Sequence, residues 1–308
     1  MCSGLILVPR FKAPEAYQAD AGEQVDVSGN FQVVCPQLDS LGPVPIIGEE
    51  DCLKLNVYVP EDVEDLLPVM IWIHGGGLET GSNNFVDYGP LRFLDKGMLV
   101  VAINYRLGPL GYLSLGTETV PGNAGLLDQV MALQWVQDNI ASFNGDPGKV
   151  TVFGESAGSA SIAYHILSPR SKGLFQRGIL QSGTPLGLTW GGYIPAAKAV
   201  EYSDMFLSNL VCTPGDLACI QSKSMVDIIN NTYVLDIPGD ALGNFGTAWM
   251  PVMDADFTED SFLPGNPKDL LNSGKFNSDV EIIIGSNREE GLLWMLGEMF
   301  YSSQYEAS

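Results

Sequence analysis

One stretch, residues 150–158, constrains the fold of this 308-residue chain more than any other. A β-branched run ends in Gly-Glu-Ser-Ala-Gly, and a helical pattern follows. This order predicts a nucleophile elbow, in which a strand turns sharply into a helix and carries a serine, Ser156, at the turn. Gly154 and Gly158 leave room for a strained turn, and the helix N-terminus favours negative charge beside the hydroxyl. An ordinary glycine-rich turn is the alternative interpretation.

The rest of the chain alternates strand-like and helix-like segments. Residues 53–59 alternate as in a half-buried strand, whereas residues 69–73 and 98–105 are apolar throughout, as in strands covered on both faces. Further strands are expected at 178–181 and 280–284. Helices are expected at 126–143, from the elbow to about 167, at 196–210 and at 219–229. Residues 1–50 and 144–148 are expected to be loop or turn. The alternation predicts an α/β fold with a mostly parallel central sheet and helices on both faces.

Composition limits the domain count and the partners. With 45% hydrophobic residues the chain can bury a large core, and it shows no internal repeat or linker, so we expect one domain over residues 1–308. Lys and Arg number 15 and Asp and Glu 37, which gives a net charge of −22 and disfavours nucleic acid and anionic membranes as partners. No apolar run reaches the length of about 18 residues that a membrane span needs.

A glycine run follows the strand expected at residues 69–73. In His74-Gly75-Gly76-Gly77 the glycines let backbone N–H groups turn towards one point, as in the oxyanion loops of lipases and esterases. Gly76 and Gly77 would donate to an oxyanion together with the N–H of Ala157, the residue after the serine. A flexible loop is the alternative for the glycine run alone. The combination of this run with the later elbow favours acyl transfer.

A serine nucleophile also needs a base and a carboxylate that orients the base. In this fold both follow the serine in the chain, and the strand at 280–284 leads to Glu289 and Glu290. A solvated surface carboxylate is the alternative for either. The only histidines are His74, which precedes the serine, and His165, which lies nine positions down the expected helix, or about 13 Å along its axis. The 308 residues therefore lack a suitable base.

The five cysteines favour an oxidising compartment. Two lie close together at Cys35 and Cys52, two at Cys212 and Cys219, and Cys2 is left over. Two local pairs and one orphan are typical of disulfide-bonded proteins, with free thiols as the alternative. The first residues show no signal-peptide pattern, which taken alone would indicate a cytosolic protein.

Many segments of the chain match one family in order. They are Arg10-Phe11-x-x-Pro14, Glu50-Asp51-Cys52-Leu53, His74-Gly75-Gly76-Gly77, Asn104-Tyr105-Arg106-Leu107-Gly108, Gly125-Leu126-x-Asp128-Gln129, Gly154-Glu155-Ser156-Ala157-Gly158, Gln181-Ser182-Gly183 and Gly285-x-Asn287-x-x-Glu290-Gly291. With these segments the chain resembles the type-B carboxylesterase and cholinesterase-like family of α/β-hydrolases.

The resemblance implies a role for each matching residue. Ser156 is expected to be the nucleophile and Glu290 the acid of the triad, with Gly76, Gly77 and Ala157 as the oxyanion hole. Ser182 is expected in the polar network beside the triad, and Trp190 near the acyl pocket. The implied substrate is a small carboxylic ester, and the implied chemistry uses neither a cofactor nor a metal.

The resemblance also implies structural pairs. They are the disulfides Cys35–Cys52 and Cys212–Cys219 and the buried ion pairs Arg10–Glu50 and Arg106–Asp128. The disulfides imply a secreted or luminal protein, and Asn230 begins a glycosylation sequon, Asn-Asn-Thr.

The chain departs from the family pattern in three respects. The family has more residues before Arg10, and its catalytic histidine follows the acid on a segment that is absent here, so we expect an incomplete domain and an inactive 308-residue polypeptide. Residues 36–51 hold no tryptophan for a choline contact, which favours a general carboxylesterase. A non-catalytic adhesion or ligand-binding relative is the alternative, although this chain keeps both the serine and the oxyanion glycines.

Overall fold

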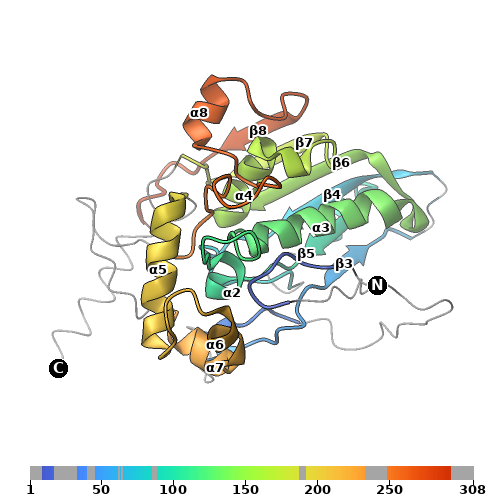
Figure 1. Ribbon diagram of the computed structural model, residues 1–308. Coiled ribbons are helices and arrows are strands. Elements are labelled where there is room, and N and C mark those ends of the chain that lie inside the picture. Colours follow the sequence, from blue (N-terminus) through green and yellow to red (C-terminus); the bar gives the residue numbers. More distant parts are fainter. Residues whose placement is uncertain are drawn as a thin grey trace.

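The structure is a computed structural model of the chain, and eight ranges of residues are described (Figure 1). These ranges are residues 9–16, 33–39, 46–61, 63, 65–84, 89–186, 192–232 and 248–292.

Six strands form the central sheet in the order β3-β5-β4-β6-β7-β8. Their bounds are Leu55–Tyr58 (β3), Leu67–Ile73 (β4), Leu99–Ile103 (β5), Gly145–Glu155 (β6), Arg177–Gln181 (β7) and Glu281–Gly285 (β8). All neighbours are parallel except β3 and β5, which confirms the predicted mostly parallel sheet. Because Glu155 pairs with Gln181 and Gln181 with Gly285, the carboxyl ends of β6, β7 and β8 lie level along one edge.

Each face of the sheet is covered, as the apolar strands predict. In β4, Val69, Ile71 and Ile73 face the larger core, which includes residues of α3 (Ala124–Asn139) and α4 (Ala157–Leu167) (Figure 1). Met70 and Trp72 face the opposite side, where partly buried residues of α1 (Leu91–Leu94) pack against them. Successive side chains of a strand point to opposite faces, so a strand buried on both sides is apolar throughout.

Further helices and turns surround this sheet. They are α2 (Gly108–Tyr112), α5 (Ala196–Asn209), α6 (Leu217–Ser222), α7 (Met225–Asn230), α8 (Pro267–Asn272) and the 3₁₀ turns Ile140–Phe143 and Pro169–Ser171. The segment expected to be helical at residues 219–229 is helical but divided into two helices, because Lys223 is extended and Ser224 caps a new helix by accepting a bond from the N–H of Asp227. Across the described ranges, no helix combines the length and the apolar character that a bilayer span requires.

Two expected loops contain strand. Within residues 1–50, β1 (Gln37–Leu38) pairs antiparallel with β2 (Ile46–Ile47), and two residues are too few to show a period of two in the sequence. The expected turn at 144–148 is largely part of β6, which starts at Gly145 and changes register opposite Leu67 and Val69. A proline in this stretch resembles a turn in sequence but is compatible with such an irregular strand start.

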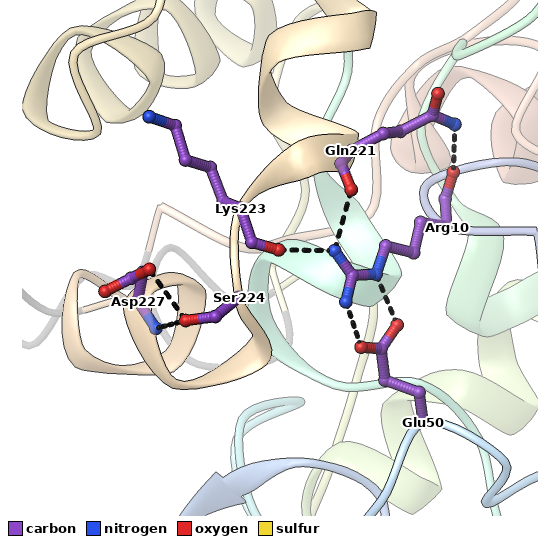
Figure 2. A network of polar contacts seen from close by, with 6 residues as sticks. All are labelled: Arg10, Glu50, Gln221, Lys223, Ser224 and Asp227. Atoms are coloured by element: carbon purple, nitrogen blue, oxygen red, sulfur yellow. Dashed lines mark hydrogen bonds and ion pairs between the residues drawn. The ribbon is translucent and has the colours of Figure 1, made fainter.

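Arg10 joins the N-terminal segment to α6 and α7 (Figure 2). Its guanidinium pairs with the carboxylate of Glu50 and donates to the carbonyl oxygens of Gln221 and Lys223, at 2.9 and 2.6 Å. These carbonyls lie at the end of α6, where a helix leaves its last acceptors unpaired. Arg10 thus connects the N-terminal segment to residues at the end of α6 that lie more than two hundred positions later in the chain.

The second arginine pair is fully buried. Arg106 Nε and Nη2 donate to Asp128 at 2.7 and 2.6 Å, and the side chains are 3% and 0% exposed. Disulfides join Cys35 to Cys52 and Cys212 to Cys219. All four pairs that the resemblance implied are therefore in contact, but the expectation that both ion pairs are buried is wrong for Arg10–Glu50, whose side chains are 23% and 29% exposed.

Candidate active site

Ser156 lies between the end of β6 and the start of α4 with φ 55° and ψ −121°. A positive φ is strained for a residue other than glycine and is typical of functional turns. The two flanking glycines have a further role that the sequence did not show. A Cβ at Gly154 would lie 2.6 Å from the carbonyl oxygen of Ile73, and one at Gly158 only 2.1 Å from it. The glycines therefore let β4 pass directly against the elbow.

The glycine run at the end of β4 lies against the serine. Gly76 and Gly77 have φ of 104° and 65°, which turn the backbone out of the strand direction. A Cβ placed on Gly75 would lie 3.1 Å from the Cβ of Ser156, so this loop and the elbow touch. The ring of His74 stacks on Tyr105 with centroids 4.4 Å apart, and Tyr105 Oη donates to the His74 carbonyl at 2.9 Å. These contacts fix the position of His74, the first residue of the loop.

Three backbone N–H groups, two in the glycine loop and one at the start of α4, have no acceptor within the described ranges. No hydrogen bond between described residues uses the backbone N–H of Gly76, Gly77 or Ala157 as its donor. A buried N–H normally has a partner. N–H donors without an acceptor among the described residues are the kind of group that an oxyanion requires.

Glu290 lies at the same sheet edge. The N–H of Ser156 donates to the carbonyl oxygen of Gln181 at 2.9 Å, and the N–H of Ser182 donates to that of Gly285 at 2.8 Å. These two bonds link the ends of β6, β7 and β8. Ser182 Oγ and the N–H of Asn287 both donate to Oε1 of Glu290, at 2.5 and 2.6 Å. Glu289 instead pairs with the exposed Arg288 at 3.3 Å. Of the two carboxylates that the sequence offered, Glu290 is the one bound to its neighbours at the edge.

Two carboxylates with shifted pKa values face this edge. The hydrogen bond from Ser182 lowers the pKa of Glu290, because it stabilises the charged form. Burial raises the pKa of Glu155, and repulsion by Glu290 raises it further. Glu155 was missed in the sequence because the elbow pattern leaves its position unspecified. Gly183 was missed as a packing position, although a Cβ there would lie 2.1 Å from the carbonyl oxygen of Ser156.

Ser182→Ala is expected to raise the pKa of Glu290, because it removes the main stabilising bond of the carboxylate. A carboxyl whose pKa is lowered by folding stabilises the protein above its unfolded pKa and loses that contribution as the pH falls through the folded pKa. The stability of the variant should therefore change less with pH over the range in which the Glu290 carboxyl titrates. A ¹³C NMR titration of the Glu290 carboxyl measures the change. Ser273→Ala, remote from the site, is the control, and an unchanged Glu290 pKa in Ser182→Ala would contradict the assignment.

Neither histidine is available as a base. His74 is 1% exposed and its Nδ1 contacts the carbonyl oxygen of Gly75 at 2.8 Å, and burial lowers its pKa to about 4. His165 is fully buried, and both ring nitrogens have partners, Ser171 and Gln129. The sequence already indicated that neither histidine can reach the serine hydroxyl, and the burial of both rings also prevents them from acting as its base.

Two further residues that the sequence singled out are not part of this sheet edge as the structure describes it. Trp190, expected near the acyl pocket, lies outside the described residues. Asn230 is the exposed last residue of α7, and the sequon's Thr232 is buried with its hydroxyl donating to the carbonyl of Ile228 at 3.3 Å.

Comparisons with known proteins agree with this geometry. Residues 8–306 match the profile of the Carboxylesterase family. The protein "Cholinesterase 1" of Branchiostoma lanceolatum is 40% identical over 256 residues, a match that spans 80% of this chain and 69% of that protein.

Proposed function

The chain belongs to the carboxylesterase family of α/β-hydrolases, and from that premise we propose that Ser156 is the nucleophile of a serine carboxylic ester hydrolase. The observation that carries the proposal is the contact between the glycine loop and the elbow, where a Cβ on Gly75 would lie 3.1 Å from the Cβ of Ser156. The contact supports the proposal that the N–H groups of Gly76, Gly77 and Ala157 donate to an oxyanion formed at Ser156.

The reaction would proceed through an acyl-enzyme. Ser156 Oγ attacks the ester carbonyl carbon while an imidazole takes its proton, and the resulting oxyanion accepts bonds from Gly76, Gly77 and Ala157. Collapse of the tetrahedral intermediate releases the alcohol, which receives the proton from the imidazolium. Water, deprotonated by the same imidazole, then attacks the acyl carbon, and the bond to Ser156 Oγ breaks as the imidazolium returns the proton to Oγ and the acid is released. Glu290 would hold the imidazole in the required tautomer.

The imidazole would come from outside these 308 residues. His74 and His165 are both enclosed, and burial lowers both pKa values, so neither can exchange a proton with the hydroxyl. We therefore expect the 308-residue polypeptide alone to hydrolyse esters very slowly, although it carries the nucleophile and the proposed oxyanion donors.

The substrate class is proposed from the first disulfide loop. A cholinesterase is among the relatives, but residues 36–51 of this chain contain no tryptophan to bind a quaternary ammonium group. Esters of uncharged alcohols are the better match. The disulfides Cys35–Cys52 and Cys212–Cys219 support a secreted or luminal location, since such bonds persist in oxidising compartments.

Hydrolysis of p-nitrophenyl acetate with added imidazole tests this proposal. Without imidazole, wild type and Ser156→Ala should hydrolyse the ester equally slowly. Added imidazole should replace the missing base and produce a rate that depends on Ser156, after subtraction of the Ser156→Ala rate at the same imidazole concentration. Ser273→Ala is a control that removes a hydroxyl far from the site.

Two outcomes would contradict parts of the proposal. A rate that stays equal in wild type and Ser156→Ala at every imidazole concentration would reject Ser156 as nucleophile. A rate that depends on Ser156 in the absence of imidazole would show that the chain contains its own base.

A further inference from the structure

A chain of buried polar side chains connects His165 to the elbow helix. Ser171 Oγ lies 2.7 Å from His165 Nδ1, and His165 Nε2 lies 2.8 Å from Gln129 Oε1. Gln129 Nε2 lies 3.3 Å from Ser161 Oγ, which donates to the carbonyl oxygen of Ala157 at 2.8 Å. All four side chains belong to residues at most 1% exposed, and they come from α3, α4 and the 3₁₀ turn Pro169–Ser171.

The end of this chain fixes the direction of every bond in it. The carbonyl oxygen of Ala157 can only accept, so Ser161 donates its hydroxyl proton there and accepts from the amide of Gln129. The carbonyl oxygen of Gln129 then accepts from Nε2 of His165, which must carry the proton. Nδ1 of His165 is left to accept from Ser171. In this arrangement every bond of the chain joins one donor to one acceptor.

The ring of His165 stays neutral in this arrangement. Burial lowers its pKa to about 3, and the edge of Phe262 packs against the ring with centroids 5.5 Å apart. A neutral ring keeps one donor and one acceptor, so the chain holds its direction across the physiological pH range. Bonds that run in one direction in a low dielectric strengthen one another.

The chain ends at the first residue of α4. Ala157 follows the proposed nucleophile, and its own N–H is one of the three donors that have no acceptor among the residues the structure describes. A helix begins with N–H groups that have no partner inside the helix. The N–H of Ala157 shares its peptide plane with the carbonyl of Ser156, which accepts from the N–H of Ala160 at 2.9 Å, and the carbonyl of Ala157 belongs to the next peptide plane of the same turn. The bond from Ser161 to the carbonyl of the same residue restrains this first turn from the buried side.

We propose that Gln129, Ser161 and His165 are positioning residues that fix the first turn of α4 and thereby aim the N–H of Ala157 at the oxyanion. The inference rests on the proposed function, since it assigns the oxyanion role to Ala157. None of the three side chains touches the substrate or the reacting atoms.

NMR of the backbone tests the positioning directly. In wild type, the ¹⁵N spectrum of His165 should show a neutral ring protonated at Nε2, and the amide of Ala157 should have the order parameter of a rigid backbone, about 0.85. Ser161→Ala and Gln129→Leu should lower this order parameter and shift the amide signal. Ser161→Thr, which keeps the hydroxyl, should restore both. Ile162→Val is the control, because it trims a buried neighbour without removing a hydrogen bond.

Binding of phenylboronic acid tests the consequence for the oxyanion. The boronic acid forms a tetrahedral adduct on a serine hydroxyl and places an oxygen where the oxyanion would lie. Ser161→Ala and Gln129→Leu should weaken its binding about tenfold, less than the loss of a whole oxyanion donor. His165→Gln keeps a donor towards Gln129 and should bind more tightly than His165→Leu. Ile162→Val should bind as wild type does.

The two measurements separate failure of this inference from failure of the proposed function. If wild type and Ser156→Ala bind the boronic acid equally, Ser156 is not the nucleophile, and the order parameter of Ala157 still decides whether the chain positions this turn. If the boronic acid binds through Ser156 but equally well in Ser161→Ala, Gln129→Leu and Ile162→Val, the positioning role is wrong. An unchanged Ala157 amide in Ser161→Ala would also overturn it.

Discussion

Gly158→Ala is expected to destabilise the fold by about 4 kcal/mol or more, the range of the most severe single substitutions. The added Cβ would lie 2.1 Å from the carbonyl oxygen of Ile73 and 2.9 Å from that of His74. Both are backbone atoms at the end of the central strand β4, so no side chain can rotate to make room. Relief requires β4 and α4 to separate, and this would open the core between them.

Urea unfolding followed by circular dichroism measures this effect. Gly265→Ala is the matched control, because its Cβ would meet only the flexible side chain of Leu270 at an ordinary 3.7 Å. A soluble Gly158→Ala protein with the unfolding midpoint of wild type would show that β4 does not pass against the elbow as described. If Gly158→Ala is recovered only as insoluble protein while Gly265→Ala is soluble, the expectation is met.

Asp128→Asn is expected to cost about 3–5 kcal/mol of stability, because it leaves the charge of Arg106 buried without a counter-ion. Asp128 accepts from the backbone N–H, Nε and Nη2 of Arg106, and the arginine side chain is only 3% exposed. The remaining contacts of Arg106, to the carbonyl oxygens of Pro9 and Ala124 at 3.1 and 3.4 Å, are neutral and cannot replace the carboxylate. A loss of this size is a large fraction of the total stability of a domain.

Glu201→Gln provides the matched control for Asp128→Asn. It also replaces a carboxylate by an amide in an ion pair, here with Lys198, but both side chains are about half exposed, at 54% and 51%. Exposed pairs contribute little, so the urea midpoint should barely move. Equal effects of the two substitutions would mean that burial of the Arg106–Asp128 pair has no energetic consequence.

The fold could be predicted from the sequence where the pattern was long and local. The apolar runs at 69–73 and 98–105 and the helical period at 126–143 gave elements close to β4, β5 and α3. The two-residue strands β1 and β2 and the four-residue helix α1 were not predicted, because such short elements show no period and depend on what packs against them.

The candidate site was predictable to the extent that its residues lie in recognisable motifs. Ser156 and the glycine run could be named from local spacing, whereas local spacing did not distinguish the adjacent Glu289 and Glu290, and the choice of Glu290 came from the family resemblance. Only the fold shows that Glu290 accepts from Ser182, which lies 108 positions earlier in the chain. The same limit explains why Glu155, next to the nucleophile, was passed over.

The sequence by itself determined the type of turn at Ser156, the family and the absence of a usable histidine among these residues, since these follow from residue types at short spacing. Tertiary structure alone decided that Gly154 and Gly158 face the backbone of β4, that Glu290 lies at the site edge, and that a buried polar chain ends at Ala157. The physical reason is that steric clash and hydrogen bonding act between atoms brought together by the sheet, whereas a sequence pattern reports the conformation of neighbouring residues.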